Sequence, residues 1–248
     1  MAHFERQIVM PNRIFTDMQQ WVKRGEIQSV QHQEFIYGFY WIISYFWRYA
    51  KYSEHGYSIS EIKQMLHYSP KDKKTNYIIK TNGLLDLKKY TKTVFDFPVV
   101  WKLQNEKLTF TMYSEFNQYE RARLNRFVTK KPFVKAPLLS IGQSNNGLFW
   151  NSEGTHIVRG EVFVQCMNNK ELGCAGLYMY GLLTNLRNIN FVNHKQSTFQ
   201  CSNETLMSLT GWGMKKVKRV TSEMYHHGLI DKQQEVRAKG YVNWYAVH

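Results

Sequence analysis

Long hydrophobic runs are scarce in this chain of 248 residues. The longest is FIYGFYWIISYFW, from Phe35 to Trp47. It is shorter than the roughly 18 to 20 residues that a helix needs to span a bilayer. The first residues, MAHFERQIVMPNR, also lack the apolar segment of a secretory signal. We therefore expect no membrane partner, and we expect Phe35 to Trp47 to form a buried helix.

Cysteine is also scarce, and its spacing matches no metal or disulfide pattern. The three cysteines, Cys166, Cys174 and Cys201, are odd in number and form no C-x-x-C pair. This usage argues against a disulfide framework and against a zinc ribbon. It fits a reducing compartment, the cytoplasm.

Common catalytic motifs are missing as well. The sequence has no Gly-x-x-x-x-Gly-Lys-Ser/Thr loop, no Gly-x-Gly-x-x-Gly and no His-Glu-x-x-His. No His-hydrophobe-His triplet accompanies the tyrosines, which disfavours a nickase with a tyrosine nucleophile. The acidic residues are too scattered to indicate a carboxylate-metal nuclease. We therefore predict no enzymatic activity, no catalytic residues, no cofactor and no bound metal.

Acidic residues are outnumbered by basic ones. The chain has 33 Lys and Arg against 19 Asp and Glu, a formal net charge of +14. So basic a protein most commonly meets nucleic acid, and next an anionic membrane surface or another polyanion. Its content of 43% hydrophobic and 15% aromatic residues suffices for one large core or two ordinary ones.

Two segments show the same order of predicted elements. Each has a core helix, a capped helix, a basic helix that ends near a glycine, and two strands joined by a polar turn. In the first segment these are a helix from His32 to Lys51, one starting at Ser58, one from Ser69 to Asn82-Gly83, and strands from Leu84 to Leu103. In the second they are a helix from Glu171 to Ile189, one from Ser202 to Gly211, one ending at Gly228, and strands flanking a turn with Arg237, Lys239 and Gly240. The similar octamers NGLLDLKK and HGLIDKQQ indicate a repeated unit.

The part of the chain between these two segments differs in amino-acid composition. It contains prolines and the Gly, Asn and Ser rich stretch GQSNNGLFWNSEGT, followed by THIVRGEVFVQC, whose alternation predicts a strand or hairpin. We predict an N-terminal domain over residues 1–112, a connector with some β structure and a dimer contact over 113–169, and a C-terminal domain over 170–248.

The second segment, SNETLMSLTGWGMKKVKRVTSEMYHHGLIDKQQEVRAKGYVNWYAV, resembles a winged helix-turn-helix DNA-binding domain of bacterial regulators and of plasmid or phage replication initiators. The stretch from Ser58 to Leu103 is similar but has a longer wing. With their core helices, the two segments cover about two thirds of the chain. The resemblance implies an α+β fold, mainly α, with two winged-helix units.

The basic residues of both segments are the predicted DNA-binding site. In a helix, residues three and four apart are neighbours, so the charges of the last helix share a face opposite Val217, Val220 and Met224. The predicted contacts of this helix are Lys215, Lys216, Lys218, Arg219 and Ser222. In the first segment they are Lys71, Lys73, Lys74, Thr75, Asn76 and Lys80. The resemblance adds wing contacts from Arg237 and Lys239, and from Lys88, Lys89 and Lys92.

Several functions are compatible with this pattern. The preferred one is a cytoplasmic bacterial protein, acting as a homodimer, that binds specific double-stranded DNA in replication initiation or replication control of a plasmid or phage. Transcriptional regulation is the first alternative, since both jobs depend on whether replication or transcription machinery is recruited. A winged-helix adaptor that binds an acidic protein is another, and a nuclease or strand-transfer enzyme is a third. Each charge cluster taken singly is also compatible with a solvated helix face.

Overall fold

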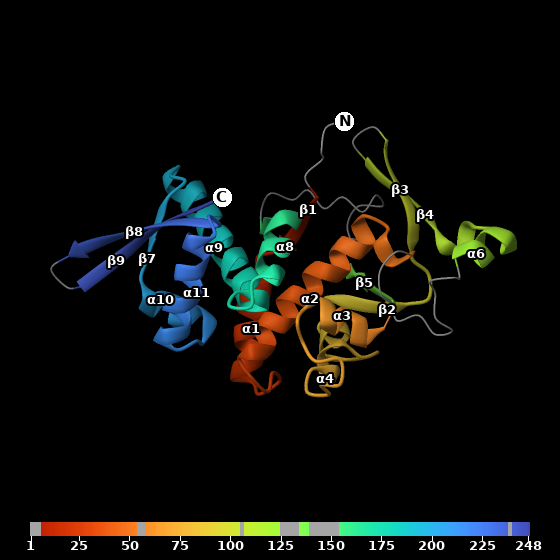
Figure 1. Cartoon of the computed structure of the whole chain (residues 1–248), viewed down its shortest axis with the longest axis horizontal. Coiled ribbons are helices and arrows are strands. Elements are labelled where there is room, and N and C mark those ends of the chain that lie inside the picture. Colours follow the sequence, from red (N-terminus) through yellow and green to blue (C-terminus); the bar gives the residue numbers. More distant parts are fainter. Residues whose placement is uncertain (1–5, 54–57, 105–106, 125–133, 139–153, 238–239) are drawn as a thin grey trace. The chain divides into compact units, whose positions relative to one another are not determined.

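A computed structural model describes residues 6–53, 58–104, 107–124, 134–138, 154–237 and 240–248 (Figure 1). The chain divides into two compact units. Unit 1 comprises residues 1–37 and 152–248, and unit 2 comprises residues 38–151. Among the described residues, helices are combined with small sheets, as expected for a mixed α and β fold.

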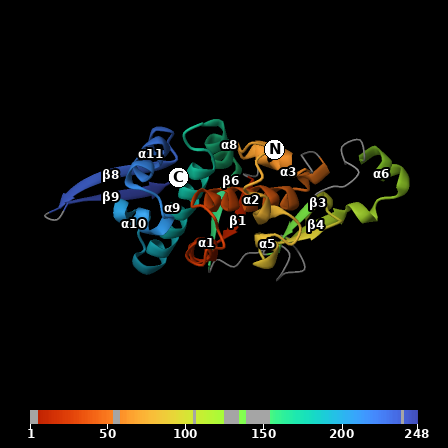
Figure 2. The same ribbon diagram turned by 90° about the horizontal axis from the view of Figure 1, so that it is seen from below.

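The described part of unit 1 contains a long central helix and two small sheets. Its elements are β1 (Gln7–Pro11), α1 (Arg13–Lys23), the first part of α2 (Gln31–Arg48), β6 (Thr155–Arg159), α8 (Gly160–Asn168), α9 (Gly173–His194), β7 (Phe199–Cys201), α10 (Asn203–Thr210), α11 (Met214–His226), β8 (Ile230–Arg237) and β9 (Gly240–Val247). Strand β1 pairs antiparallel with β6, and β9 lies between β7 and β8 in an antiparallel sheet. Figure 2 shows the β8–β9 hairpin extending beyond α10 and α11.

Helix α9 is the centre of unit 1. Every residue from Cys174 to Asn185 is buried, and α9 packs against α8, β6, α11, β7 and β9. A helix that is apolar on most sides is stable only when it is enclosed, and this explains the run of leucines, methionine and tyrosines. The predicted core helix from Glu171 is therefore confirmed, and it supports α10 and α11.

Gly181 lets α9 pack closely against the first part of α2. A Cβ atom at position 181 would overlap the hydroxyl and ring of Tyr37, whose ring is fully buried. We expect Gly181→Ala to lower the free energy of unfolding by about 1 to 3 kcal/mol, because a rigid buried ring must move. Urea unfolding followed by circular dichroism measures this change. Gly213→Ala is the matched control, since a Cβ there meets nothing within 4 Å; equal effects of the two substitutions would contradict the packing.

His156 on β6 is a buried neutral histidine. Its Nδ1–H donates to Asn12 Oδ1 (2.9 Å), and its Nε2 accepts the Tyr37 O–H (2.7 Å). Burial lowers the pKa of His156 to about 3 from the ordinary 6.5. In the unfolded chain His156 is therefore protonated below about pH 6.5, whereas in the folded chain it stays neutral down to about pH 3.

This difference predicts a loss of stability in acid. As pH falls from 6.5 towards 3, His156 costs roughly 1 kcal/mol of folding free energy per pH unit. Urea unfolding at pH 7, 5 and 4 should show a smaller decline for His156→Gln than for the wild type. Replacement of the exposed His194 by Gln should leave the wild-type decline unchanged. The same pH dependence in wild type and His156→Gln would refute the assignment.

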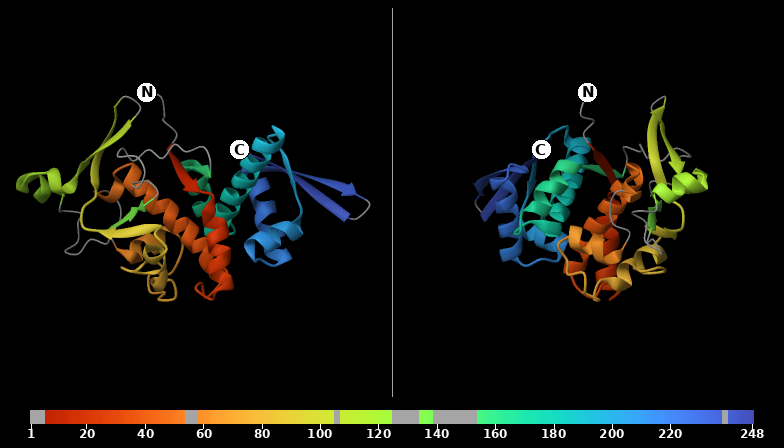
Figure 3. Two further views of the ribbon diagram at one scale, coloured as in Figure 1. Left: turned by 180° about the vertical axis from the view of Figure 1, so that it is seen from behind. Right: turned by 45° about the vertical axis from the view of Figure 1, so that its right-hand side comes forward.

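Within the described ranges, unit 2 contains short helices and two two-stranded sheets. Its elements are the remainder of α2, η1 (Lys51–Ser53), α3 (Ile59–Met65), α4 (Asn76–Ile79), α5 (Leu84–Leu87), β2 (Thr91–Val94), β3 (Pro98–Gln104), β4 (Lys107–Met112), η2 (Tyr113–Glu115), α6 (Gln118–Leu124) and β5 (Val134–Pro137). Strand β2 pairs with β5, and β3 pairs with β4. Figure 3 shows β3 and β4 as a two-stranded ribbon.

A buried ion pair organises the core of unit 2. Asp86 on α5 accepts hydrogen bonds from the Asn82 amide (3.0 Å), from the Thr91 and Thr93 hydroxyls (2.5 and 3.0 Å) and from Lys135 Nζ (2.5 Å). The Lys135 side chain is only 1% exposed. Asp86 therefore ties α5 to both strands of the β2–β5 sheet.

Several local predictions are confirmed. Helix α2 spans Gln31–Arg48, close to the predicted core helix. Ser58 and Glu61 form a capping box at the start of α3. The Ser202 hydroxyl accepts the Thr205 N–H (3.1 Å) at the start of α10, and Gly211 ends that helix with φ +71°. These signals depend on residues three or four positions apart, so the sequence alone reveals them.

The predicted helix from Ser69 to Gly83 is wrong in its extent. Helix α4 covers only Asn76–Ile79. Asp72 Oδ1 accepts the Lys74 N–H (2.8 Å), and the Asp72 carbonyl accepts from the buried Lys63 Nζ. Such bonds compete with helical hydrogen bonding, so the preceding residues form turns.

The predicted strand after Gly83 begins instead as a helix, α5. Asn82 adopts the left-handed conformation (φ +56°), and Gly83 does not. Gly83 is required by space, because a Cβ there would lie 2.7 Å from the Tyr77 carbonyl oxygen. The resemblance between NGLLDLKK and HGLIDKQQ therefore does not extend to structure, since Gly228 has φ +66° and leads into β8.

The connector prediction is also revised. In THIVRGEVFVQC, the first residues form β6, but the remainder forms α8 in place of a second strand. Val162, Cys166 and Met167 are buried at helical spacing, and packing of α8 against α9 overrides the β preference of its valines. Because β6 pairs with β1, this segment lies in unit 1, unlike in the predicted division at 112 and 169. The dimer contact stays a prediction.

Candidate nucleic-acid interface

Helix α11 has one buried face and one cationic face. Val217, Val220, Thr221 and Met224 are buried. On the opposite side lie the exposed Lys215, Lys218 and Arg219 and the half-buried Ser222. The helical spacing in the sequence predicted that these residues share a face, and in the structure they do so on α11.

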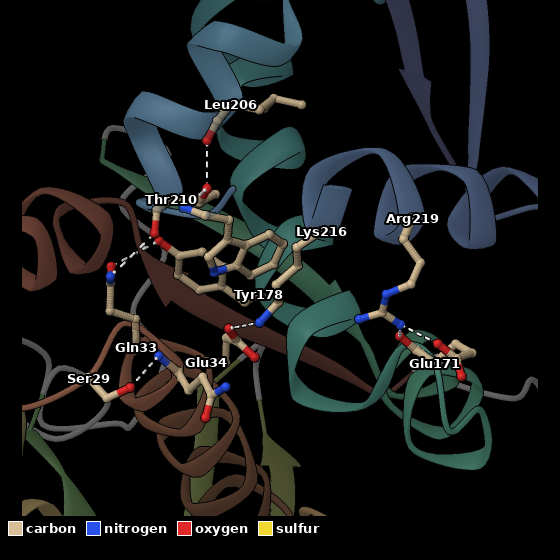
Figure 4. A network of polar contacts seen from close by, with 11 residues as sticks. Ser29, Gln33, Glu34, Glu171, Tyr178, Leu206, Thr210, Lys216 and Arg219 are labelled. Atoms are coloured by element: carbon tan, nitrogen blue, oxygen red, sulfur yellow. Dashed lines mark hydrogen bonds and ion pairs between the residues drawn. The ribbon is translucent and has the colours of Figure 1, made fainter. Parts of the chain in front are cut away.

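Lys216 differs from its neighbours because it points back into unit 1. Its Nζ donates to Glu34 Oε1 of α2 (2.5 Å) and lies 4.5 Å from the centre of the Trp212 ring (Figure 4). The Glu34 side chain is 7% exposed, and burial raises its pKa, although Lys216 opposes that rise. A predicted DNA contact is thus engaged in an intramolecular ion pair that fixes the start of α11.

The turn between α10 and α11 is also held in place. The Gln19 and Gln33 side-chain amides donate to the carbonyls of Leu209 (2.5 Å) and Thr210 (3.4 Å). The Thr210 hydroxyl donates to the Leu206 carbonyl (2.7 Å) and accepts the Trp212 N–H (3.1 Å) (Figure 4). Helix α11 is therefore presented on a fixed support from α1, α2 and α10.

Arg219 is anchored at a second point. Its Nη1 donates to the Glu171 carbonyl (2.8 Å) and to the Glu171 carboxylate (Figure 4). The two side chains are 41% and 60% exposed, so this pair is solvated and contributes little to stability. In the described part of the chain, Lys215 and Lys218 form no ion pair.

Lys232 on β8 is a nearby cation that the sequence analysis missed. Its Nζ donates to the buried Thr221 Oγ1 of α11 (3.1 Å). Burial lowers the pKa of Lys232, and the neighbouring charge of Lys218 lowers it further. The alternation of side chains along β8 could have revealed it, because Lys232 shares a strand face with the buried Ile230.

The β8–β9 hairpin corresponds to the predicted second wing. Arg237 is the last residue of β8 and pairs with Gly240. Lys239 lies outside the described residues, as does the side chain of Arg237. Their predicted contacts with DNA stay predictions.

The predicted site residues of unit 2 are dispersed. Lys71, Lys73 and Lys74 lie in the irregular segment before α4, and exposed Lys80 follows α4. Thr75 is buried, and Asn76 Oδ1 accepts from Lys63 Nζ (2.5 Å), so neither side chain is presented on a helix face. Lys88 and Lys89 follow α5 and lie at no hairpin tip, while Lys92 is exposed on β2. Lys89 has φ +59°.

Among the described residues, no group of three or more His, Cys, Asp or Glu side chains is arranged to hold a metal ion. No helix within the described ranges combines the length and apolarity needed to cross a membrane. Comparison with protein-family models, with curated proteins and with solved structures finds no match.

Proposed function

We propose that the segment from α9 to β9 is a winged helix-turn-helix domain that binds specific double-stranded DNA. The element order α9, β7, α10, α11, β8, β9 and the sheet order β7-β9-β8 support this proposal. In such a domain α11 is the helix that enters the major groove, and the β8–β9 hairpin is the wing beside it.

The proposal rests on a difference among the cations of α11: two of them contact acidic residues of the protein, and in the described part of the chain two do not. Lys216 is engaged with Glu34, and Arg219 contacts Glu171. Lys215 and Lys218 are exposed and have no such partner among the described residues. A rigidly held helix with exposed lysines beside Ser222 suits contacts to phosphates and base edges.

The protein would then act by occupying a DNA site. It needs no catalytic group or cofactor for this role, and replication initiation or replication control of a plasmid or phage remains the preferred task. A binding site upstream of a promoter, in place of an origin, would assign it to transcription.

Salt titration of duplex binding tests which lysines contact phosphate. The logarithm of the affinity should fall linearly with the logarithm of the salt concentration, by about 0.9 per phosphate contact. Lys215→Met and Lys218→Met should each reduce this slope by about 1. Lys216→Met should leave the slope unchanged, even if it lowers stability. An equal reduction for Lys216→Met would contradict the assigned roles, and salt-independent binding by the wild type would contradict the proposed function.

A further inference from the structure

A chain of aromatic rings runs through unit 2 from α2 to β3. The ring centroids of Trp41 and Tyr45 are 5.4 Å apart, and those of Tyr45 and Tyr49 are 5.3 Å apart. Trp41 and Tyr45 lie four positions apart on one face of α2. Tyr49 directly follows the end of the helix, where its N–H donates to the Tyr45 carbonyl (3.0 Å). The Tyr49 ring then meets Trp101 of β3 edge-on, at 5.6 Å.

The chain of rings leads from the core to the surface. Trp41 is only 2% exposed, Tyr45 and Tyr49 are half-buried, and Trp101 is 37% exposed. Phe110 of β4 lies directly opposite Trp101 in the strand pairing and is also half-buried. Aromatic side chains that only fill a core do not need to remain this accessible.

The α2 end of this chain of rings is cationic. Residues 38–53 contain Arg48 and Lys51 and no Asp or Glu. The Arg48 guanidinium lies 5.7 Å from the centre of the Tyr49 ring. A purely apolar partner would gain nothing from this charge, whereas a polyanion would.

We propose that Tyr45, Tyr49, Trp101 and Phe110 form a stacking surface for single-stranded nucleic acid. Unpaired bases expose the faces that stack on aromatic side chains, and lysine and arginine neutralise the adjoining phosphates. A duplex keeps its base faces covered, so this ligand differs from the one proposed for α11. The site lies wholly within unit 2 and does not depend on the function proposed for unit 1.

Fluorescence anisotropy with a labelled oligo(dT) of about 15 nucleotides tests this proposal. Trp101→Ala should weaken binding about tenfold, in keeping with the loss of one stacked base. Arg48→Gln should weaken it to a similar degree, because it removes the charge beside the Tyr49 ring. Phe95→Ala is the matched control, because Phe95 is 93% exposed in the same unit but has no place in the stacking surface. An oligo(U) of the same length distinguishes RNA from DNA as the preferred strand.

The two sites can be separated by repeating the measurement in the full chain with Lys215→Glu and Lys218→Glu. Oligo(dT) binding should persist in this variant and remain sensitive to Trp101→Ala. The proposal is overturned if the variant no longer binds either oligonucleotide, or if Trp101→Ala and Arg48→Gln bind both as tightly as the wild type does. Duplex binding by the wild type, measured in parallel, reports separately on the function of α11.

Discussion

Replacing Lys215 and Lys218 together by glutamate is expected to lower affinity for the specific duplex site by about a thousandfold or more. Both side chains are exposed on α11, and among the described residues neither has an ion-pair partner. The substitution removes two cations from the proposed interface and adds two anions that repel phosphate. Specific complexes are typically a thousandfold or more tighter than non-specific ones, so losing the α11 contacts leaves only the weak mode.

The control variant changes the net charge by the same amount, but at two lysines outside α11. Lys170 and Lys195 are exposed and lie outside α11. Glutamate at both positions alters the net charge equally, and affinity should fall much less. Anisotropy titrations at one fixed salt concentration measure both variants. If the two double variants lose the same affinity, the protein binds DNA through net charge and not through α11.

Asp86→Ala is expected to lower the free energy of unfolding by about 3 to 5 kcal/mol. It leaves the ammonium of Lys135 buried without its carboxylate, and Thr91 and Thr93 lose their acceptor. Burial already lowers the pKa of Lys135, while Asp86 favours its charged form. Removing the carboxylate that neutralises a buried ammonium is costlier than the loss of an ordinary hydrogen bond.

Urea unfolding of the full chain provides the measurement. Asp231→Ala is a suitable control, because Asp231 pairs with His248 at the surface, with side chains 64% and 49% exposed. That change should cost at most about 1 kcal/mol. If the two alanine variants are equally stable, Asp86 does not organise the core of unit 2.

The C-terminal segment was the more predictable part of the chain. Ser202, Gly211 and Gly228 mark helix ends through bonds or dihedral angles within a few residues, and the spacing of Val217, Val220 and Met224 fixes the buried face of α11. The stretch after Ser58 was less predictable because distant contacts shape it. Lys63 bonds Asp72 and Asn76, and Lys135 reaches Asp86 across 49 residues.

Within the candidate site, too, local spacing was predictable and distant contacts were not. Helical spacing identified the cationic face, but it could not separate Lys216 from Lys215. The partner of Lys216, Glu34, lies 182 residues away in the sequence. Lys232 was not predicted as part of the site, because its position beside α11 depends on the packing of β8 against Thr221. Charge patterns predict where cations gather, while tertiary contacts decide which of them are engaged.

Selection of binding sites from a random pool of double-stranded DNA tests the central claim most directly. The purified protein should enrich a defined motif, and that motif should bind about a thousandfold or more tightly than its scrambled version at the same salt concentration. Enrichment should disappear when Lys215 and Lys218 are both glutamate. If the wild type enriches no motif and binds all duplexes weakly, its basic helix does not read DNA sequence, and the claim fails.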